Sequence, residues 1–152
     1  MPAYTIAAHR QRIESTFGRA AAVTDLQTQA DLAKYLCVLT SGLLEQAARQ
    51  LYREHTKRSA SPRVLRYVER RLEFFQNPKA RKLVELASDF DPAWGTELEG
   101  FLVDERRDHV DSVVANKNQI AHGENVGITY MRAREYFDSV VEVVEFIEHQ
   151  CA

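Results

Sequence analysis

Residues 32–51, LAKYLCVLTSGLLEQAARQL, contain the clearest structural pattern of the chain. Their apolar side chains recur at spacings of three and four residues, which is the repeat of an amphipathic α-helix that buries one face. The positions of this stripe are Leu32, Tyr35, Leu36, Val38, Leu39, Leu43, Ala47 and Leu51. The pattern predicts one long helix from about Thr28 to His55, against which the rest of the chain packs.

Helical signals continue on both sides of this stretch. Before it, Ile6, Ile13, Phe17 and Ala20 predict a first helix that ends near Thr24. After it, three prolines each follow a residue that favours the N-cap position: Ser61-Pro62, Asn77-Pro78 and Asp91-Pro92. Proline loses no hydrogen bond in the first helical turn, and the preceding side chain can accept from the free amides there. Each pair therefore predicts the start of a short helix.

Two further helices complete the pattern. One runs from about Asp104 to His122 and is closed by Gly123, which suits the left-handed position after a helix; the other begins after Thr129. The side chains expected to face inward in the short helices and the last helix are Val64, Leu65, Val68, Leu72, Phe75, Leu83, Val84, Leu86, Trp94, Leu98, Phe101, Phe137, Val140, Val141, Val144 and Ile147. No segment alternates convincingly with period two. We expect an all-α helical bundle of about six or seven helices, with a long second helix and short inserted helices.

Length and composition limit the classes of protein to consider. A chain of 152 residues with 45% hydrophobic and 28% charged residues fits one globular domain, residues 1–152. The uncharged stretches are far shorter than the ~20 apolar residues that span a bilayer, and the N-terminus lacks the pattern of a signal peptide. We therefore expect a cytoplasmic protein that does not enter a membrane. Cys37 is expected to be a core thiol and Cys151 an ordinary tail residue, with no metal and no cofactor bound.

The formal charge of −2 hides an uneven distribution. Residues 49–82 contain eleven basic and three acidic side chains, a formal charge of +8, so the remainder carries −10. Arg63, Arg66 and Arg70 share one outward side of their helix, where they could lie along a phosphate backbone. The alternative is a solvated face that keeps the protein soluble or pairs with the acidic residues between 97 and 111.

The most polar helix end is residues 115–125, ANKNQIAHGEN. Asn118 and His122 are four residues apart and share a face, and the long side chain of Lys117 can reach the same place. The helix dipole favours a protonated imidazole in the last turn, so His122 suits general acid or base catalysis; the alternative is a simple capping residue. Arg107 and His109, further back on this helix, are expected to face solvent.

Glu45 is a carboxylate on the otherwise apolar side of the long helix. Because burying an unpaired carboxylate is costly, it must reach solvent or a partner. It either supports the geometry of Lys117 and His122 or pairs with Arg49 one turn further on.

Residues 118–123, NQIAHG, resemble the RN-x-IAHG signature of the HEPN superfamily of helical RNA-acting domains, specifically its RiboL-PSP-like branch. The resemblance covers about residues 25–148. It extends to YLCVL before SGLLE at 35–45, to Asn77-Pro78-Lys79, to FDPAW at 90–94, and to Ile128-Thr129 before Tyr136-Phe137.

The resemblance implies a homodimer in which the two signature segments face each other. In active HEPN members an arginine and a histidine, four to six residues apart, cleave RNA without a metal. His122 falls on the histidine position, with Asn118 placed to contact phosphate or orient it, but Lys117 occupies the position of the arginine. Lysine supplies charge without the two-pronged arginine fork. The resemblance thus predicts an endoribonuclease of a toxin or defence system, with RNA and an antitoxin or other protein as partners. The alternatives are an RNA-binding or regulatory domain that does not cut and a helical dimerisation module without nucleic acid.

Overall fold

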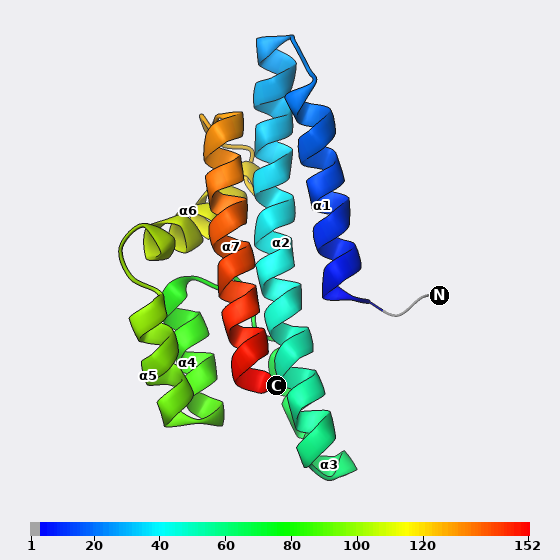
Figure 1. The fold of residues 1–152 in the computed structure, drawn as a ribbon, viewed down its shortest axis with the longest axis vertical. Helices are drawn as coiled ribbons and strands as arrows, with labels where there is room; N and C mark the ends of the chain where they lie inside the picture. The colour runs from blue at the N-terminus through cyan, green and yellow to red at the C-terminus, as the bar shows by residue number, and fades with distance from the viewer. Residues whose placement is uncertain (1–3) are drawn as a thin grey trace.

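A computed structural model describes residues 4–152, which form seven α-helices and no strand (Figure 1). The helices are α1 (Ile6–Ala21), α2 (Leu26–Ser59), α3 (Pro62–Leu72), α4 (Ala80–Phe90), α5 (Pro92–Phe101), α6 (Asp104–Ala121) and α7 (Tyr130–Cys151). The all-α prediction is confirmed, including the long second helix and the short helices that follow it. The long helix is one to two turns longer than expected.

Helix α2 is the axis of the molecule (Figure 1). Helices α1 and α7 run alongside it, α6 lies across it, and α3 folds back from its C-terminal end. Helices α4 and α5 form a pair in which α5 packs against α7 and α4 against α6. The predicted stripe accounts for this arrangement, since Leu36, Leu43 and Ala47 are fully buried between the neighbouring helices. In the part of the chain described, we find no helix with the length and apolar character needed to cross a bilayer.

Side chains cap most of the helix starts as the sequence predicts. Ser61, Asp91 and Thr129 each accept a hydrogen bond from an amide two or three residues later, and Pro62 and Pro92 occupy the first helical positions. The Asn77-Pro78 prediction is wrong by two residues, because α4 begins at Ala80 after Lys79, whose side chain makes no cap. Its first amide is capped instead from α6, where Asp111 Oδ1 accepts from Ala80 N at 2.8 Å.

Several burial predictions need correction. Val64 is half exposed, whereas Leu72 at the other end of α3 is buried. His109 is buried rather than solvent-facing, with Nδ1 2.7 Å from Ser139 Oγ on α7. Cys151 is also buried, because the last turn of α7 docks on α2, where Arg58 donates to the Cys151 carbonyl. Cys37 is in the core, as expected.

Candidate functional site

The polar end of α6 is held in one defined backbone arrangement. His122 is the C-cap residue, and its amide donates to the Asn118 carbonyl at 3.1 Å. Gly123 follows in the left-handed conformation with φ +76°, its amide donating to the Ile120 carbonyl at 3.0 Å. The amide of Glu124 reaches the Gln119 carbonyl at 2.9 Å. This paired pattern is the Schellman motif, so the predicted closure by Gly123 is confirmed.

The predicted site side chains at this helix end are not occupied by polar contacts within the described part of the chain. His122 is exposed, and Lys117 and Asn118 are half-buried. Within residues 4–152, no hydrogen bond or ion pair engages the side chains of these three residues; the contact between Asn118 and His122 is between backbone atoms. A rigid backbone therefore presents a cation and an imidazole from a single helix end, with an amide side chain beside them.

A polar network behind this helix end escaped the sequence analysis. Asn116 Nδ2 donates to the Tyr136 hydroxyl at 3.4 Å, and the Tyr136 ring meets the His109 imidazole edge-on at 5.6 Å. His109 Nε2 lies 3.9 Å from Glu135 Oε2. These contacts fix the rotation of α6 against α7. The signal that could have revealed them is the three-residue spacing of Tyr136 and Ser139, which places both on one side of α7.

Glu45 pairs within its own helix. Its carboxylate lies 3.7 Å from Arg49 Nη2 one turn on, as in the second of the two predicted arrangements. Arg49 in turn donates to the backbone carbonyl of Phe75. No hydrogen bond or ion pair joins Glu45 to Lys117 or His122 in the described part of the chain; its partner is Arg49.

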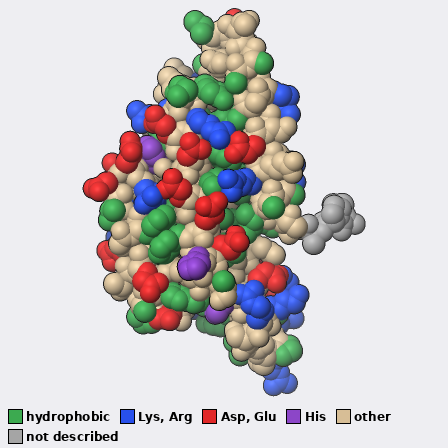
Figure 2. Space-filling model, viewed as in Figure 1, with side chains coloured by type: hydrophobic (Ala, Val, Ile, Leu, Met, Phe, Trp, Pro, Cys, Tyr) green, Lys and Arg blue, Asp and Glu red, His purple; other side chains and the backbone are tan. Residues whose placement is uncertain are grey.

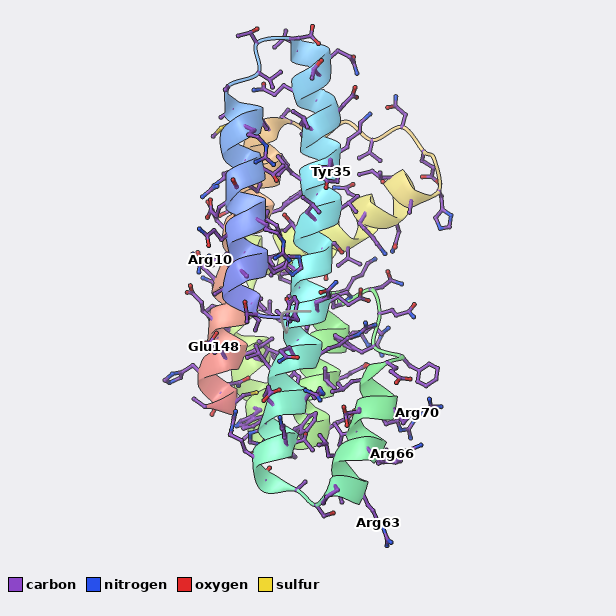
Figure 3. The ribbon with its side chains drawn as sticks, turned by 90° about the vertical axis from the view of Figure 1, so that its right-hand side faces the viewer. Arg10, Tyr35, Arg63, Arg66, Arg70 and Glu148 are labelled. Carbon is purple, nitrogen blue, oxygen red and sulfur yellow. The ribbon has the colours of Figure 1, made fainter. Side chains whose placement is uncertain are left out.

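The basic side chains of α3 form an exposed row. Arg63, Arg66 and Arg70, which we call the basic stripe, point away from α2 along the outer side of α3 (Figure 3). Arg70 makes an exposed ion pair with Glu73 at 3.4 Å, while no ion pair in residues 4–152 involves Arg63 or Arg66. In Figure 3, α3 and the C-terminal end of α6 both project to the same side of α2.

The positively charged segment 49–82, which we call the basic segment, is not neutralised by the acidic residues between 97 and 111. Each ion pair of its arginines is with a glutamate near in sequence: Glu45, Glu54, Glu69, Glu73 or Glu85. Figure 2 accordingly shows basic side chains gathered where α2 ends, while acidic ones are spread over the α7 face. The predicted alternative of pairing with residues 97–111 is therefore wrong, and the stripe remains open to an anion.

Two surface clefts lie away from the end of α6. The larger, about 890 Å³, is lined by α1, α2 and α7, and none of its lining residues is a predicted site residue. The second, about 760 Å³, lies between α3 and α4. Within residues 4–152, no three His, Cys, Asp or Glu side chains are grouped to hold a metal ion.

Comparison with known proteins identifies the family. The family model described as RiboL-PSP-HEPN matches residues 7–152, nearly the whole chain. Neither the curated proteins nor the solved structures include a significant match. The match covers α2–α7 and all but the first residue of α1, and it includes the helix end that carries Lys117, Asn118 and His122. The chain is therefore a member of the RiboL-PSP-HEPN family.

Proposed function

We propose that this HEPN domain cleaves RNA without a metal ion, with His122 as the general acid or base and Lys117 as the stabilising cation. The observation that carries the proposal is the end of α6, where both side chains project unpaired from a helix end held by the Schellman motif. A toxin or defence system is the setting that we propose for this activity.

The reaction would be an attack by a ribose 2′-hydroxyl on the adjacent phosphate. His122 takes the 2′ proton as the new oxygen–phosphorus bond forms, and the departing 5′ oxygen then needs a proton. Lys117 contributes positive charge near the phosphoryl oxygens, where negative charge grows in the transition state. Asn118, one residue on, is placed to donate to a phosphoryl oxygen. A homodimer that brings two such helix ends together would supply a second imidazole for the leaving group.

This chain departs from the family pattern at position 117, where a lysine stands in place of the arginine. A lysine ammonium is a point charge and cannot grip two oxygens at once as an arginine fork does. The second candidate function is therefore an RNA-binding or regulatory domain that does not cut and acts through dimerisation or a protein partner. It is favoured by Lys117 together with the exposed basic stripe, which can bind phosphate whether or not the bond is cut.

The test is RNA cleavage in the presence of EDTA. We expect the parent protein to cleave single-stranded or structured RNA, His122→Ala to lose at least a hundredfold in rate, and Lys117→Arg to gain. His149→Ala is the matched control, because His149 is an exposed histidine on α7, away from the signature. If parent and His122→Ala are equally inert across a broad RNA panel, nuclease activity is refuted and the binding function stands alone.

A further inference from the structure

The groove between α3 and α4 is lined by aromatic side chains that the fold leaves uncovered. Tyr67 and Phe74 are 61% and 71% exposed, whereas the neighbouring Phe75 is buried. Leu86 and Phe90 of α4 complete the apolar floor. Exposed aromatic rings beside a buried one are not needed to stabilise the core, so their presence on the surface points to a ligand.

These rings lie on the same side of α3 as the basic stripe. Tyr67 is four residues after Arg63 and three before Arg70, and Phe74 is four residues after Arg70, just past the last turn. Positions with this spacing are neighbours on a helix surface. The stripe and the two rings therefore form one continuous surface that leads into the groove.

The charges around the groove are unevenly placed. On the α3 side, Arg71 Nε donates to the Tyr67 hydroxyl at 3.2 Å, which places its guanidinium beside that ring. Lys82, at the start of α4, lies over the Phe75 ring. Further along α4, Asp89 and Glu85, which pairs with Arg81 at 3.1 Å, line the opposite wall. A polyanionic backbone is therefore attracted to the arginines of α3 and repelled by Asp89 and Glu85 of α4. The groups carried by that backbone then turn inward over the aromatic rings.

We propose that the α3–α4 groove binds unpaired bases of single-stranded RNA, which stack on Tyr67 and Phe74 while Arg71 and the basic stripe hold the phosphates. The inference rests on the proposed function only in taking RNA as the ligand. Aromatic rings beside a cationic track are the means by which proteins bind single strands, because every base has a face that can stack. Paired bases are hidden inside a duplex, so the groove selects unpaired RNA.

The main competitor for the groove is an apolar helix of a protein partner. Such a helix would need apolar bulk at positions 67 and 74 but no aromatic ring. It would also gain from basic residues opposite Glu85 and Asp89, whereas RNA would be repelled by that wall. The two occupants therefore predict different responses to the same substitutions.

The experiment measures binding by fluorescence anisotropy, using the full chain with His122→Ala so that the RNA stays intact. The probe is a short labelled uridine-rich oligonucleotide, compared with the same strand in a duplex. Tyr67→Leu with Phe74→Leu keeps the apolar bulk and removes the rings, and we expect affinity to fall about tenfold or more. Phe74→Tyr alone keeps both rings and the Tyr67 hydroxyl to which Arg71 donates, so its affinity should stay well above that of the leucine variant.

Two further variants complete the comparison. Met131→Ala removes an equally exposed apolar side chain from α7 and should leave binding unchanged. Glu85→Gln with Asp89→Asn should bind RNA equally well or more tightly, since it removes charges that repel phosphate. Thermal unfolding of each variant checks that the fold is intact.

Several outcomes would overturn the proposal. They are parent-like binding by the leucine variant, equal affinity for the duplex, and loss of binding when Glu85 and Asp89 are neutralised. If RNA is cleaved in a His122-dependent manner without any effect of positions 67 and 74, the groove proposal fails while the proposed function survives. If the parent binds no RNA even at low salt, both fail together.

Discussion

Arg49 holds the backbone of Phe75 with two hydrogen bonds, from Nε at 3.0 Å and from Nη2 at 2.6 Å. The same Nη2 lies 3.4 Å from the Glu73 carbonyl. Phe75 follows the end of α3 and is buried. The Arg49 side chain therefore attaches the α3–α4 connection to α2. The Glu45 carboxylate, one turn earlier, lies 3.7 Å from the same Nη2. Glu45, which the sequence offered either as support for the candidate site or as a partner of Arg49, thus takes part in a structural contact.

Replacing Arg49 should destabilise the protein even when the charge is kept. Lysine cannot donate two bonds to one carbonyl from a planar fork, so we expect Arg49→Lys to lower the free energy of unfolding by about 1–2 kcal/mol. Urea denaturation measures the change. Arg63→Lys is the matched control, because Arg63 is exposed and should shift the midpoint hardly at all. Equal midpoints for the two variants would show that the Arg49 bonds add nothing to stability.

Adding one methyl group at two glycines should have opposite effects. At Gly123, φ is +76°, which costs an L-residue about 1 kcal/mol, so Gly123→Ala should lower stability and disturb the backbone that presents His122. Gly18 lies exposed within α1 with open space around it, so Gly18→Ala should raise stability by about 0.5–1 kcal/mol. Thermal melts of both variants test the sign. Stabilisation by Gly123→Ala would contradict the left-handed assignment.

The two thiols should be unreactive in the native state. Burial raises the pKa of Cys37 to about 12 and that of Cys151 to about 11, both from an ordinary value of 9.0. An aromatic disulfide reagent at pH 8 should therefore react with neither thiol until denaturant is added. Fast reaction of one thiol without denaturant would show that its helix opens readily.

The same shifts predict a loss of stability at alkaline pH. Above pH 9 the unfolded chain gains from thiolate formation, while the folded thiols stay protonated until about pH 11–12. Stability should fall as the pH rises through this window. Replacing Cys37 by alanine should make the loss of stability with rising pH less steep. If the slope of stability against pH is unchanged, groups other than Cys37 cause the loss.

RNA binding should depend on salt through the basic stripe. Each phosphate contact with a single strand adds about 0.7 to the slope of log affinity against log salt concentration. We expect Arg63→Gln, Arg66→Gln and Arg70→Gln together to reduce this slope by about 2 and to weaken binding similarly for all sequences. Arg12→Gln removes an exposed arginine of α1 and is the control. An unchanged slope in the triple variant would place the phosphates elsewhere.

The helices could be predicted from the sequence because their signals are local. The stripe of α2, the caps at Ser61, Asp91 and Thr129, and the left-handed Gly123 each depend on residues a few positions apart. The start of α4 could not be predicted in this way, because its first amide is satisfied by Asp111, 31 residues away in the sequence. A long-range cap leaves no pattern near the helix that it starts.

Burial of polar residues was equally hard to predict. The sequence predicts His109 as a surface residue, but in the fold its imidazole is hydrogen-bonded to Ser139 of α7. The sequence likewise predicts Cys151 as a tail residue, but Arg58 of α2 donates to its carbonyl. The close approach of α4 and α5 was also not predicted from the sequence. A Cβ at Gly95 of α5 would collide with Ser88 of α4, and residue spacing within one helix does not reveal such a contact. At the candidate site, Lys117, Asn118 and His122 remain predictions from the sequence, and the structure adds that no hydrogen bond or ion pair within residues 4–152 engages their side chains.

The ion pairs that the basic segment forms with nearby glutamates affect how the protein approaches a polyanion in solution. Because its arginines pair with glutamates near in sequence rather than with the distant acidic helices, the separation of charge along the chain persists in space. The protein therefore has a lasting electric dipole despite a net charge of only −2. In the field of a polyanion such a molecule rotates before contact, so that α3 arrives first and collisions are productive more often than random orientation allows.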